Sequence, residues 1–198
     1  MRRGVADNSQ IVYYTDWLVK QTESMRSNNK QHEILQAAFV VVAEQGANRL
    51  TMDAVAVESG FSKGGVLYHF SSKKALLSGM LDYLVEVNVS RIEEQKTSHL
   101  LAALITARQS TDTAERTSTL ALLTAFAEDT RLLEPARTQM ANLFQESLEE
   151  KTEKEEAATL FFANEGLRFL ELFDLCPLDD RTIRNLTHYL KKQAENLK

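Results

Sequence analysis

Apolar residues recur every three or four positions along most of the chain, which is the spacing of one face of an α-helix. With only 7 glycines and 2 prolines, the chain has little material for the tight turns of an all-β fold. The pattern therefore predicts an all-α protein. The predicted helices cover residues 32–45, 51–60, 62–70, 72–94 and about 98–109, then segments that begin near residues 112, 135, 152 and 179, the one from 152 ending near 175.

Residues at the predicted helix ends have the chemistry of caps. Thr51, Ser62 and Asp179 each precede an apolar helical repeat, where a side-chain oxygen accepts from a free backbone N–H. Thr152, with a glutamate three residues later, resembles a capping box. Gly46 follows the first helix, and we expect it to be a left-handed C-cap.

The stretch from Thr51 to Lys73 predicts a short helix, a glycine-centred turn and a second short helix. This is the outline of a helix-turn-helix, whose second helix presents its first residues to the DNA major groove. Here that helix opens Ser-Lys-Gly-Gly. Gly64 and Gly65 each cost a helix about 1 kcal/mol relative to alanine, which is reasonable where the backbone must approach a neighbouring surface. Val66 and Phe70, four residues apart, are predicted to lie in the core.

Several exposed side chains of this stretch suit contacts with DNA. Lys63 can reach a guanine edge or a phosphate, and Leu67 can contact a thymine methyl group. Phosphate contacts are expected from residues with hydroxyl, imidazole or ammonium groups, two of them at helix starts: Thr51, Tyr68, His69 and Lys73. Each residue has a structural alternative, since Tyr68 and His69 can be packing residues, Lys73 a solvated one and Thr51 a plain cap.

The order and spacing of these residues resemble the TetR family of bacterial transcriptional regulators over about residues 30–80. The resemblance rests on Thr51, Val55, Ala56, Ser59-Gly60-Phe61-Ser62, Lys63-Gly64, Tyr68-His69-Phe70, Ser72-Lys73 and Leu76-Leu77, with Ala37-Ala38-Phe39 and Gly46 before them. It implies a homodimer with an N-terminal three-helix helix-turn-helix domain and a C-terminal helical ligand-binding and dimerisation domain. By position, it implies base contacts from Lys63, Gly64, Gly65 and Leu67, and phosphate contacts from Thr51, Tyr68, His69 and Lys73. Ser62 completes the predicted DNA-binding set. Family members often have tyrosine where Leu67 stands.

The predicted organisation has three parts. Residues 1–29 form an extension, either poorly ordered or a short amphipathic helix; residues 30–76 form the DNA-binding domain; residues 77–198 form the ligand-binding and dimerisation domain. The chain carries a net charge of −5, but residues 26–80 hold six basic and four acidic side chains. Because local charge governs attraction to phosphates, the predicted DNA-binding segment has the favourable sign.

Residues 157–175 are apolar nearly all round, which indicates a helix buried on two sides. We expect this helix and the last one, with Ile183, Leu186, Tyr189 and Leu190, to form a four-helix bundle across a two-fold axis. The alternative is that both helices are internal to one chain. A pocket between helices should be apolar with a few polar groups, and its candidate residues are Leu123, Phe126, Met140, Phe144, Phe162, Asn164, Glu165 and Arg168. Glu165 and Arg168 can equally be a surface ion pair.

Other functions find little support in the sequence. No run of about 18 apolar residues predicts a membrane span, and the single cysteine, Cys176, suits a reducing cytoplasm. The histidines (His32, His69, His99 and His188) lack metal-ligand spacing, and no nucleophile–base pair is evident. We therefore expect no enzyme, metal or cofactor.

The leading hypothesis is a dimeric repressor on double-stranded DNA with a palindromic operator, released by a small hydrophobic or amphipathic inducer. The alternative is a DNA-bound protein–protein adaptor without an inducer.

Overall fold

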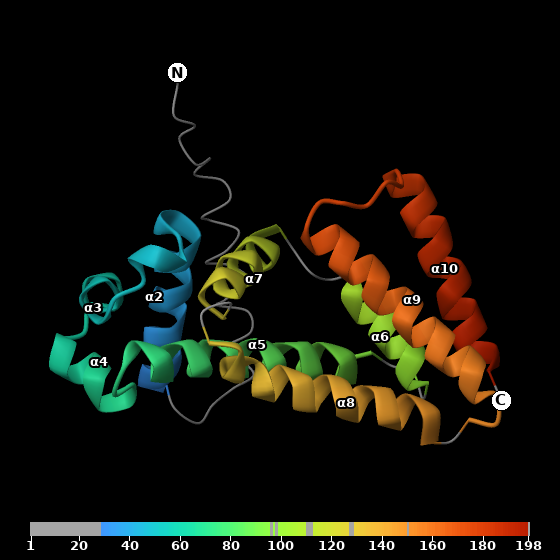
Figure 1. Cartoon of the computed structure of the whole chain (residues 1–198), viewed down its shortest axis with the longest axis horizontal. Helices are drawn as coiled ribbons and strands as arrows, with labels where there is room; N and C mark the ends of the chain where they lie inside the picture. The colour runs from blue at the N-terminus through green and yellow to red at the C-terminus, as the bar shows by residue number, and fades with distance from the viewer. Residues whose placement is uncertain are drawn as a thin grey trace. The chain divides into compact units, whose positions relative to one another are not determined.

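The computed structural model describes residues 29–95, 97, 99–109, 113–126, 129–149 and 151–197, and this part of the chain has no β-strand. The all-α fold predicted from the sequence is confirmed. Apart from Asn29, the predicted N-terminal extension lies outside the described residues. The helices (Figure 1) are α2 (Asn29–Gln45), the 3₁₀ helix η1 (Ala47–Arg49), α3 (Met52–Ser59), α4 (Lys63–His69), α5 (Lys73–Glu93), α6 (Leu100–Arg108), α7 (Thr113–Phe126), the 3₁₀ helix η2 (Thr130–Leu133), α8 (Glu134–Glu149), α9 (Lys154–Leu172) and α10 (Asp180–Asn196).

The chain divides into two compact units. The first holds the described residues up to Leu84 together with α7 and η2; the second holds those from Val85 to Gln109 and from Pro135 onward. Helix α5 contributes its first half to one unit and its second half to the other. Within the first unit α7 packs against α2, although it follows residue 76, where the sequence places the domain boundary. The functional division at that residue stays a prediction.

The core of the first unit gathers apolar residues at helical spacing from every helix of the predicted DNA-binding domain. Val66 and Phe70 of the α4 segment are 0% and 4% exposed, which confirms the prediction that they lie in the core. The other fully buried large side chains of this unit are Ile34, Phe39, Val41 and Val42 of α2, Leu50, Val55 of α3, Leu76 and Met80 of α5, and Leu122 of α7. Removing these groups from water holds the short helices α3 and α4 in place.

Side-chain caps fix the starts of α3, α4 and α10, as predicted. The Thr51 hydroxyl accepts from the N–H of Ala54 at 3.1 Å, and the Ser62 hydroxyl accepts from that of Gly65 at 3.0 Å. The Asp179 carboxylate accepts from the N–H of Thr182 at 2.7 Å at the start of α10. Each cap satisfies a donor that the helix itself leaves free.

Three predicted helix ends are wrong. Gly46 has φ 85° and ψ 157°, so its φ is positive but the residue is not the left-handed C-cap; it leads into η1. Thr152 does not cap α9, because the N-cap is Glu153, which makes no side-chain cap hydrogen bond. Helix α9 ends at Leu172 rather than near Leu175, since Asp174 turns to a positive φ of 55°. Asp112, near which the sequence predicts the start of a helix, lies outside the described residues.

An ion-pair cluster joins η2 to the start of α5. The Asp129 carboxylate accepts from Lys74 Nζ at 2.7 Å and from Arg131 Nε at 2.8 Å. Hydrogen bonds from Arg131 and then from Lys74 hold the pKa of Asp129 well below its usual range. Lys74 is thus engaged within the first unit, while its neighbour Lys73 is exposed.

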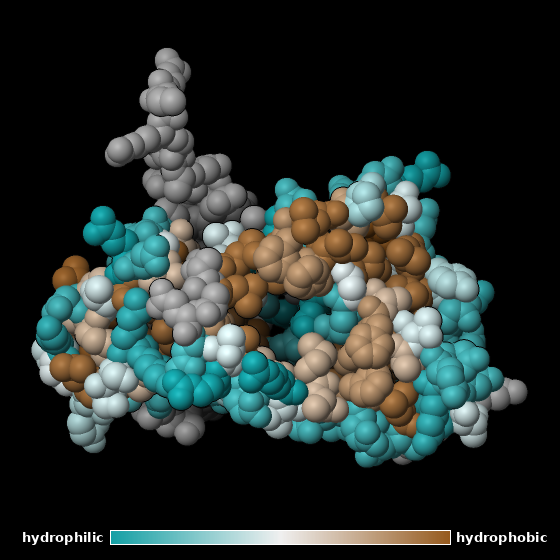
Figure 2. Space-filling model, viewed as in Figure 1, coloured by the Kyte–Doolittle hydropathy of each residue, from teal (hydrophilic) through white to brown (hydrophobic). Residues whose placement is uncertain are grey.

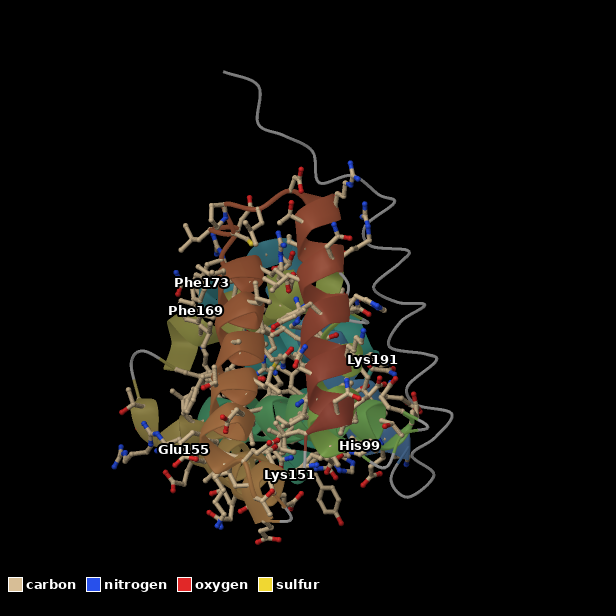
Figure 3. All side chains as sticks on the ribbon, turned by 90° about the vertical axis from the view of Figure 1, so that its right-hand side faces the viewer. His99, Lys151, Glu155, Phe169, Phe173 and Lys191 are labelled. Atoms are coloured by element: carbon tan, nitrogen blue, oxygen red, sulfur yellow. The ribbon has the colours of Figure 1, made fainter. Side chains whose placement is uncertain are left out.

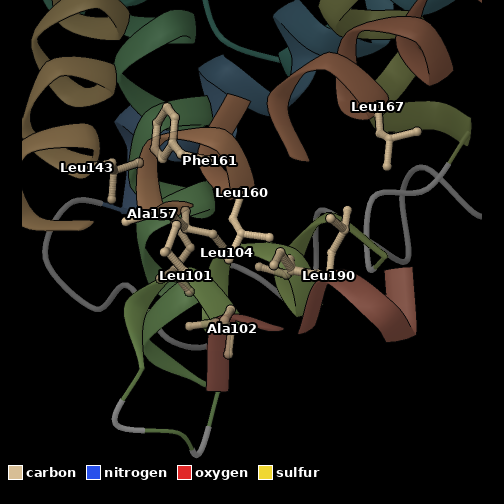
Figure 4. Packing of buried hydrophobic residues seen from close by; sticks show 14 residues of the cluster. Leu101, Ala102, Leu104, Leu143, Ala157, Leu160, Phe161, Leu167 and Leu190 are labelled. Carbon is tan, nitrogen blue, oxygen red and sulfur yellow. The ribbon is translucent and has the colours of Figure 1, made fainter. Parts of the chain in front are cut away.

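The second unit packs α6, α9 and α10 against one another. Its core, seen from close by in Figure 4, includes Leu101 and Leu104 of α6, Leu160 and Phe161 of α9, and Leu190 of α10. Met140, Phe144 and Leu148 of α8 pack against this cluster while partly buried. The apolar core is thus continuous across the three helices.

Gly79 of α5 provides a test of the first unit's packing. A Cβ at this position would lie 2.6 Å from Cε1 of the buried Phe70 ring and 3.4 Å from Cδ2 of Leu35. Gly79→Ala should therefore lower the free energy of unfolding by ~1–3 kcal/mol, because the overpacking outweighs the gain in helix propensity. Urea unfolding measures the change. A variant as stable as the parent would contradict the close contact between α5 and Phe70.

Candidate nucleic-acid interface

Helix α4 separates a buried face from an exposed one. Val66 faces the core, followed by the C-cap Phe70, whereas Gly64, Leu67 and Tyr68 lie on the outside. The side chain of Tyr68 is 86% exposed and that of Leu67 is 38% exposed. These three residues share one face by their spacing, so α4 offers a continuous surface to a partner while its other side holds the helix in place.

Gly64 and Gly65 leave the backbone of the first turn of α4 without side chains at two positions. A Cβ on Gly64 would meet only the Ser62 hydroxyl oxygen, at 3.9 Å, so the fold itself has room for a side chain there. At Gly65 the same oxygen would lie 3.3 Å away, beside the Phe61 ring. Gly65 is thus partly explained by packing around the cap, whereas nothing in the fold requires Gly64. A close external surface is the remaining physical reason for it.

Lys63, the first residue of α4, pairs with Asp53 of α3. Its Nζ lies 2.9 Å from the carboxylate, and both side chains are mostly exposed. An exposed pair of this kind contributes ~0–1 kcal/mol, so Lys63 remains available to an outside anion. The spacing of the two residues along the sequence does not predict this contact, because the turn between α3 and α4 brings them together.

The other predicted contact residues surround the same face. Thr51 is exposed at the start of α3, and Lys73 is exposed at the start of α5. His69 is half-buried and its ring meets that of Tyr68 edge to face, with centroids 5.2 Å apart. All predicted DNA-contact positions lie in the first unit on or beside the turns that flank α3 and α4. Their contacts with DNA stay predictions.

One residue on this side escaped the sequence analysis. Val57 of α3 is 84% exposed, one helical turn after Asp53. The signal was available, since an apolar residue four positions after an exposed carboxylate occupies the same helix face. An apolar side chain in this place is suited to contact a thymine methyl group or a sugar.

A small cavity of about 20 Å³ lies within the second unit. A space of this size holds roughly one water molecule. The residues around it come from α5, α6, α8 and α9: Asn88, Ile92, Leu104, Arg108, Met140, Leu143, Asn164, Glu165 and Arg168. More than half of them carry polar or charged side chains, unlike the mainly apolar pocket expected from the sequence.

The structure brings together only part of the predicted ligand-binding set. Met140, Asn164, Glu165 and Arg168 line the cavity. Phe144 stacks edge to face on Phe161, with centroids 5.2 Å apart, and does not line it. The remaining three are placed elsewhere, because Leu123 and Phe126 belong to the first unit and Phe162 is 63% exposed. Ligand binding at the cavity stays a prediction.

Metal-ligating side chains form no cluster of three or more among the described residues. Within that same part of the chain, no helix combines the length and apolar character needed to cross a membrane. Neither finding identifies a function.

Comparisons with known sequences agree with the geometry of α3 and α4. Residues 34–80 match the family described as bacterial regulatory proteins, tetR family, and residues 97–195 match the tetracyclin repressor-like C-terminal domain. The chain belongs to the TetR family. It is a DNA-binding transcriptional regulator.

Two curated relatives illustrate this membership. The nucleoid occlusion factor SlmA of Vibrio vulnificus (strain YJ016) is 33% identical over 109 residues, which cover 52% of this chain and 48% of that protein. The uncharacterized HTH-type transcriptional regulator YerO of Bacillus subtilis (strain 168) is 30% identical over 66 residues, covering 33% of this chain and 23% of YerO. The TetR-family chain thus matches about half of the length of such relatives or less.

Solved structures share the fold. A TetR-family member from Streptomyces coelicolor A3, SCO1917, has a TM-score of 0.66 at 20% identity, covering 82% of this chain and 98% of that chain. The multidrug binding protein EbrR complexed with ethidium has a TM-score of 0.60 at 21% identity, covering 81% and 98%. At these identities the likeness establishes the TetR-family fold alone.

A substitution at Gly64 should affect the stability of the fold and the binding of DNA in opposite directions. Gly64→Ala should raise the free energy of unfolding by up to ~1 kcal/mol, because alanine favours the helix and the added methyl group makes no contact closer than 3.9 Å, to the Ser62 hydroxyl oxygen. The same change should weaken operator binding about tenfold, because the methyl group separates α4 from the base edges. Urea unfolding and fluorescence anisotropy measure the two effects. Unchanged DNA affinity would mean that Gly64 does not face DNA.

Proposed function

We propose that this TetR-family regulator is a homodimeric repressor that binds a palindromic operator and is released by a small molecule. The exposed face of α4 carries the proposal. Lys63, Gly64, Gly65 and Leu67 would face base edges in the major groove. The phosphate contacts would come from residues around them: Thr51, Ser62, Tyr68, His69 and Lys73.

A dimer is supported by unsatisfied apolar surface on the last two helices. Phe162 and Phe169 of α9 are 63% and 57% exposed, and Tyr189 of α10 is 57% exposed. The rings of Phe169 and Phe173 are in contact, tilted by 45° with centroids 4.6 Å apart, and both lie on the side of α9 away from α10 in Figure 3. Hydrophobic atoms also gather at the surface over α9 in Figure 2. Such a patch marks an interaction site rather than a solvated face.

Gly166 lies within this exposed strip of α9. It follows Phe162 by four residues and precedes Phe169 by three, and a Cβ there would meet no atom within 4 Å. A glycine between two outward-facing aromatic rings lets a second helix approach the backbone closely. We therefore expect α9 of one copy to cross α9 of the other at Gly166, with the aromatic rings on either side of the glycine packed against those of the partner.

Two copies related by a two-fold axis would read two half-sites of the same sequence in opposite directions. Helix-turn-helix dimers place their recognition helices in successive major grooves, roughly 34 Å apart or a multiple of it. Footprinting on the DNA beside the regulator's own gene tests this arrangement. A protected palindrome supports it, and a footprint without two-fold symmetry contradicts it.

Release by a small molecule is supported by the cavity of the second unit and by the structural neighbours. The structure of EbrR has been solved in complexes with ethidium and with malachite green. These ligands are those of EbrR. In our chain the cavity would be the corresponding site. It admits a ligand only after its walls move apart, because about 20 Å³ is the space of one water molecule.

A DNA-bound adaptor is the second candidate. The small size of the cavity favours it, as does the similarity to proteins named nucleoid occlusion factor. An adaptor would use its acidic C-terminal part to hold another protein and would need no inducer. Thermal unfolding in the presence of a small-molecule library separates the two functions, since a ligand that binds the folded state raises the midpoint.

Phe169 tests the dimer. Phe169→Glu should weaken self-association about tenfold or more, because a carboxylate in an apolar interface loses its hydration without a partner. Analytical ultracentrifugation measures the dissociation constant. Gln145→Glu, which adds the same charge on an exposed position of α8, is the control and should leave the dimer intact. Equal effects of the two variants would exclude this face of α9.

Lys63 and His69 test the DNA contacts independently of the dimer. Lys63→Ala and His69→Ala should each weaken operator binding about tenfold, and Lys63→Ala should reduce the salt dependence of binding by about one ion if Lys63 meets a phosphate. Lys192→Ala on exposed α10 is the control. Gel filtration should show unchanged dimers, and loss of the dimer together with DNA binding would contradict these assignments.

A further inference from the structure

Charged and polar side chains form one connected chain of hydrogen bonds through the second unit. Arg108 of α6 donates from Nε to Oδ1, the side-chain amide oxygen of Asn164, at 3.1 Å. Its two terminal nitrogens donate to the carboxylate of Glu171 in α9 and to the hydroxyl of Thr187 in α10. The Asn164 amide donates to Glu165 at 3.2 Å. Glu165 in turn pairs with Arg168 at 2.7 Å. Glu165 and Arg168 thus form an ion pair, and both residues also line the cavity.

Stability alone is a weak explanation for this chain. The Arg108 side chain is 3% exposed, and the Asn164 residue is 3% exposed. Burying a guanidinium group and an amide costs several kcal/mol before their partners compensate, and apolar residues of similar volume are often as stable or more so. The polar chain also leads directly to the cavity, since Arg108, Asn164, Glu165 and Arg168 all line it. These observations point to a binding site.

The charges around the cavity favour an anion. Two guanidinium groups and one carboxylate line it, while Glu171, the partner of Arg108, does not. Arg108 is held by three partners, so it is the less available of the two arginines. Arg168 is 40% exposed and is bonded to Glu165 through one of its terminal nitrogens. A guanidinium group has five N–H donors in a planar fork, so Arg168 can receive a second carboxylate.

The apolar part of the cavity lining includes the side chains of α8, the helix best suited to move. Met140 and Leu143 come from α8, and Ile92 and Leu104 from α5 and α6. Helices α6, α9 and α10 make the close helix contacts of this unit, and α8 packs on them less closely. A methionine side chain with three rotatable bonds adapts readily to an incoming group. Outward displacement of α8 would therefore enlarge the cavity on its apolar side.

We propose that the cavity binds a small amphipathic carboxylate, with its carboxylate on Arg168 and its apolar body against Met140 and Leu143. This inference rests on the proposed release by a small molecule and names the chemical class of that molecule. It differs from a site for cationic dyes, because a cation would meet two guanidinium groups. Binding would draw Arg168 partly away from Glu165 and alter the chain that joins α6, α9 and α10.

The test compares ligands that share a skeleton but differ in charge. Straight-chain and phenyl-substituted carboxylates, their amides and their amines are added to the full-length protein, and the unfolding midpoint and dissociation constant are measured. Ethidium is the cationic reference. We expect the carboxylates to bind about tenfold or more tightly than the matched amides and amines. Arg168→Gln should remove that advantage, whereas Arg181→Gln on exposed α10 should retain it.

Operator binding by the same samples separates this inference from the proposed function. If amines or ethidium bind better, if no carboxylate in the series binds, or if Arg168→Gln leaves carboxylate binding unchanged, the inference is overturned while DNA binding stands. If carboxylates bind through Arg168 but do not release the operator, the inference holds and release by a small molecule fails.

Discussion

The contact between the Phe70 ring and α5 at Gly79 is the constraint on which the proposed DNA-reading surface depends. Phe70 ends α4, and its ring occupies the space that a side chain at Gly79 would fill. With Val66 fully buried beside it, one face of α4 is fixed against the core. The remaining face, from Lys63 to Tyr68, then has a single orientation. Helix α4 has seven residues and is too short to be stable in isolation. Its orientation therefore comes from these buried contacts and from the Ser62 cap.

Local chemistry made much of the fold predictable. A hydroxyl or carboxylate oxygen before an apolar repeat can accept a free backbone N–H and cap the helix, and Thr51, Ser62 and Asp179 do so. The exceptions have longer-range or backbone causes. Gly46 adopts a positive φ but enters a 3₁₀ turn instead of closing a left-handed cap. The grouping of α7 with α2 depends on tertiary packing, and no spacing along the chain reports it.

The two candidate sites differ in how far the sequence determines them. The predicted DNA contacts lie within a few residues of one another along the chain, so their placement follows from two short helices and a turn. The cavity is assembled from four helices far apart in sequence. The sequence shows polar residues on an apolar helix, among them Asn164 and Arg168, but it does not place them around the same cavity as Arg108. Leu123 and Phe126 have the apolar character expected of a pocket, but both belong to the first unit, where Phe126 is buried in the core.

We propose a surface that reads DNA and an exposed aromatic strip suited to self-association, and the central claim is that α4 reads a symmetric operator. Selection of bound sequences from a random DNA pool tests that claim most directly. We expect enrichment of inverted repeats whose half-sites are separated by about one helical turn or a multiple of it, and the loss of this enrichment in Lys63→Ala. Recovery of a single asymmetric site, or no enrichment over the starting pool, would contradict it.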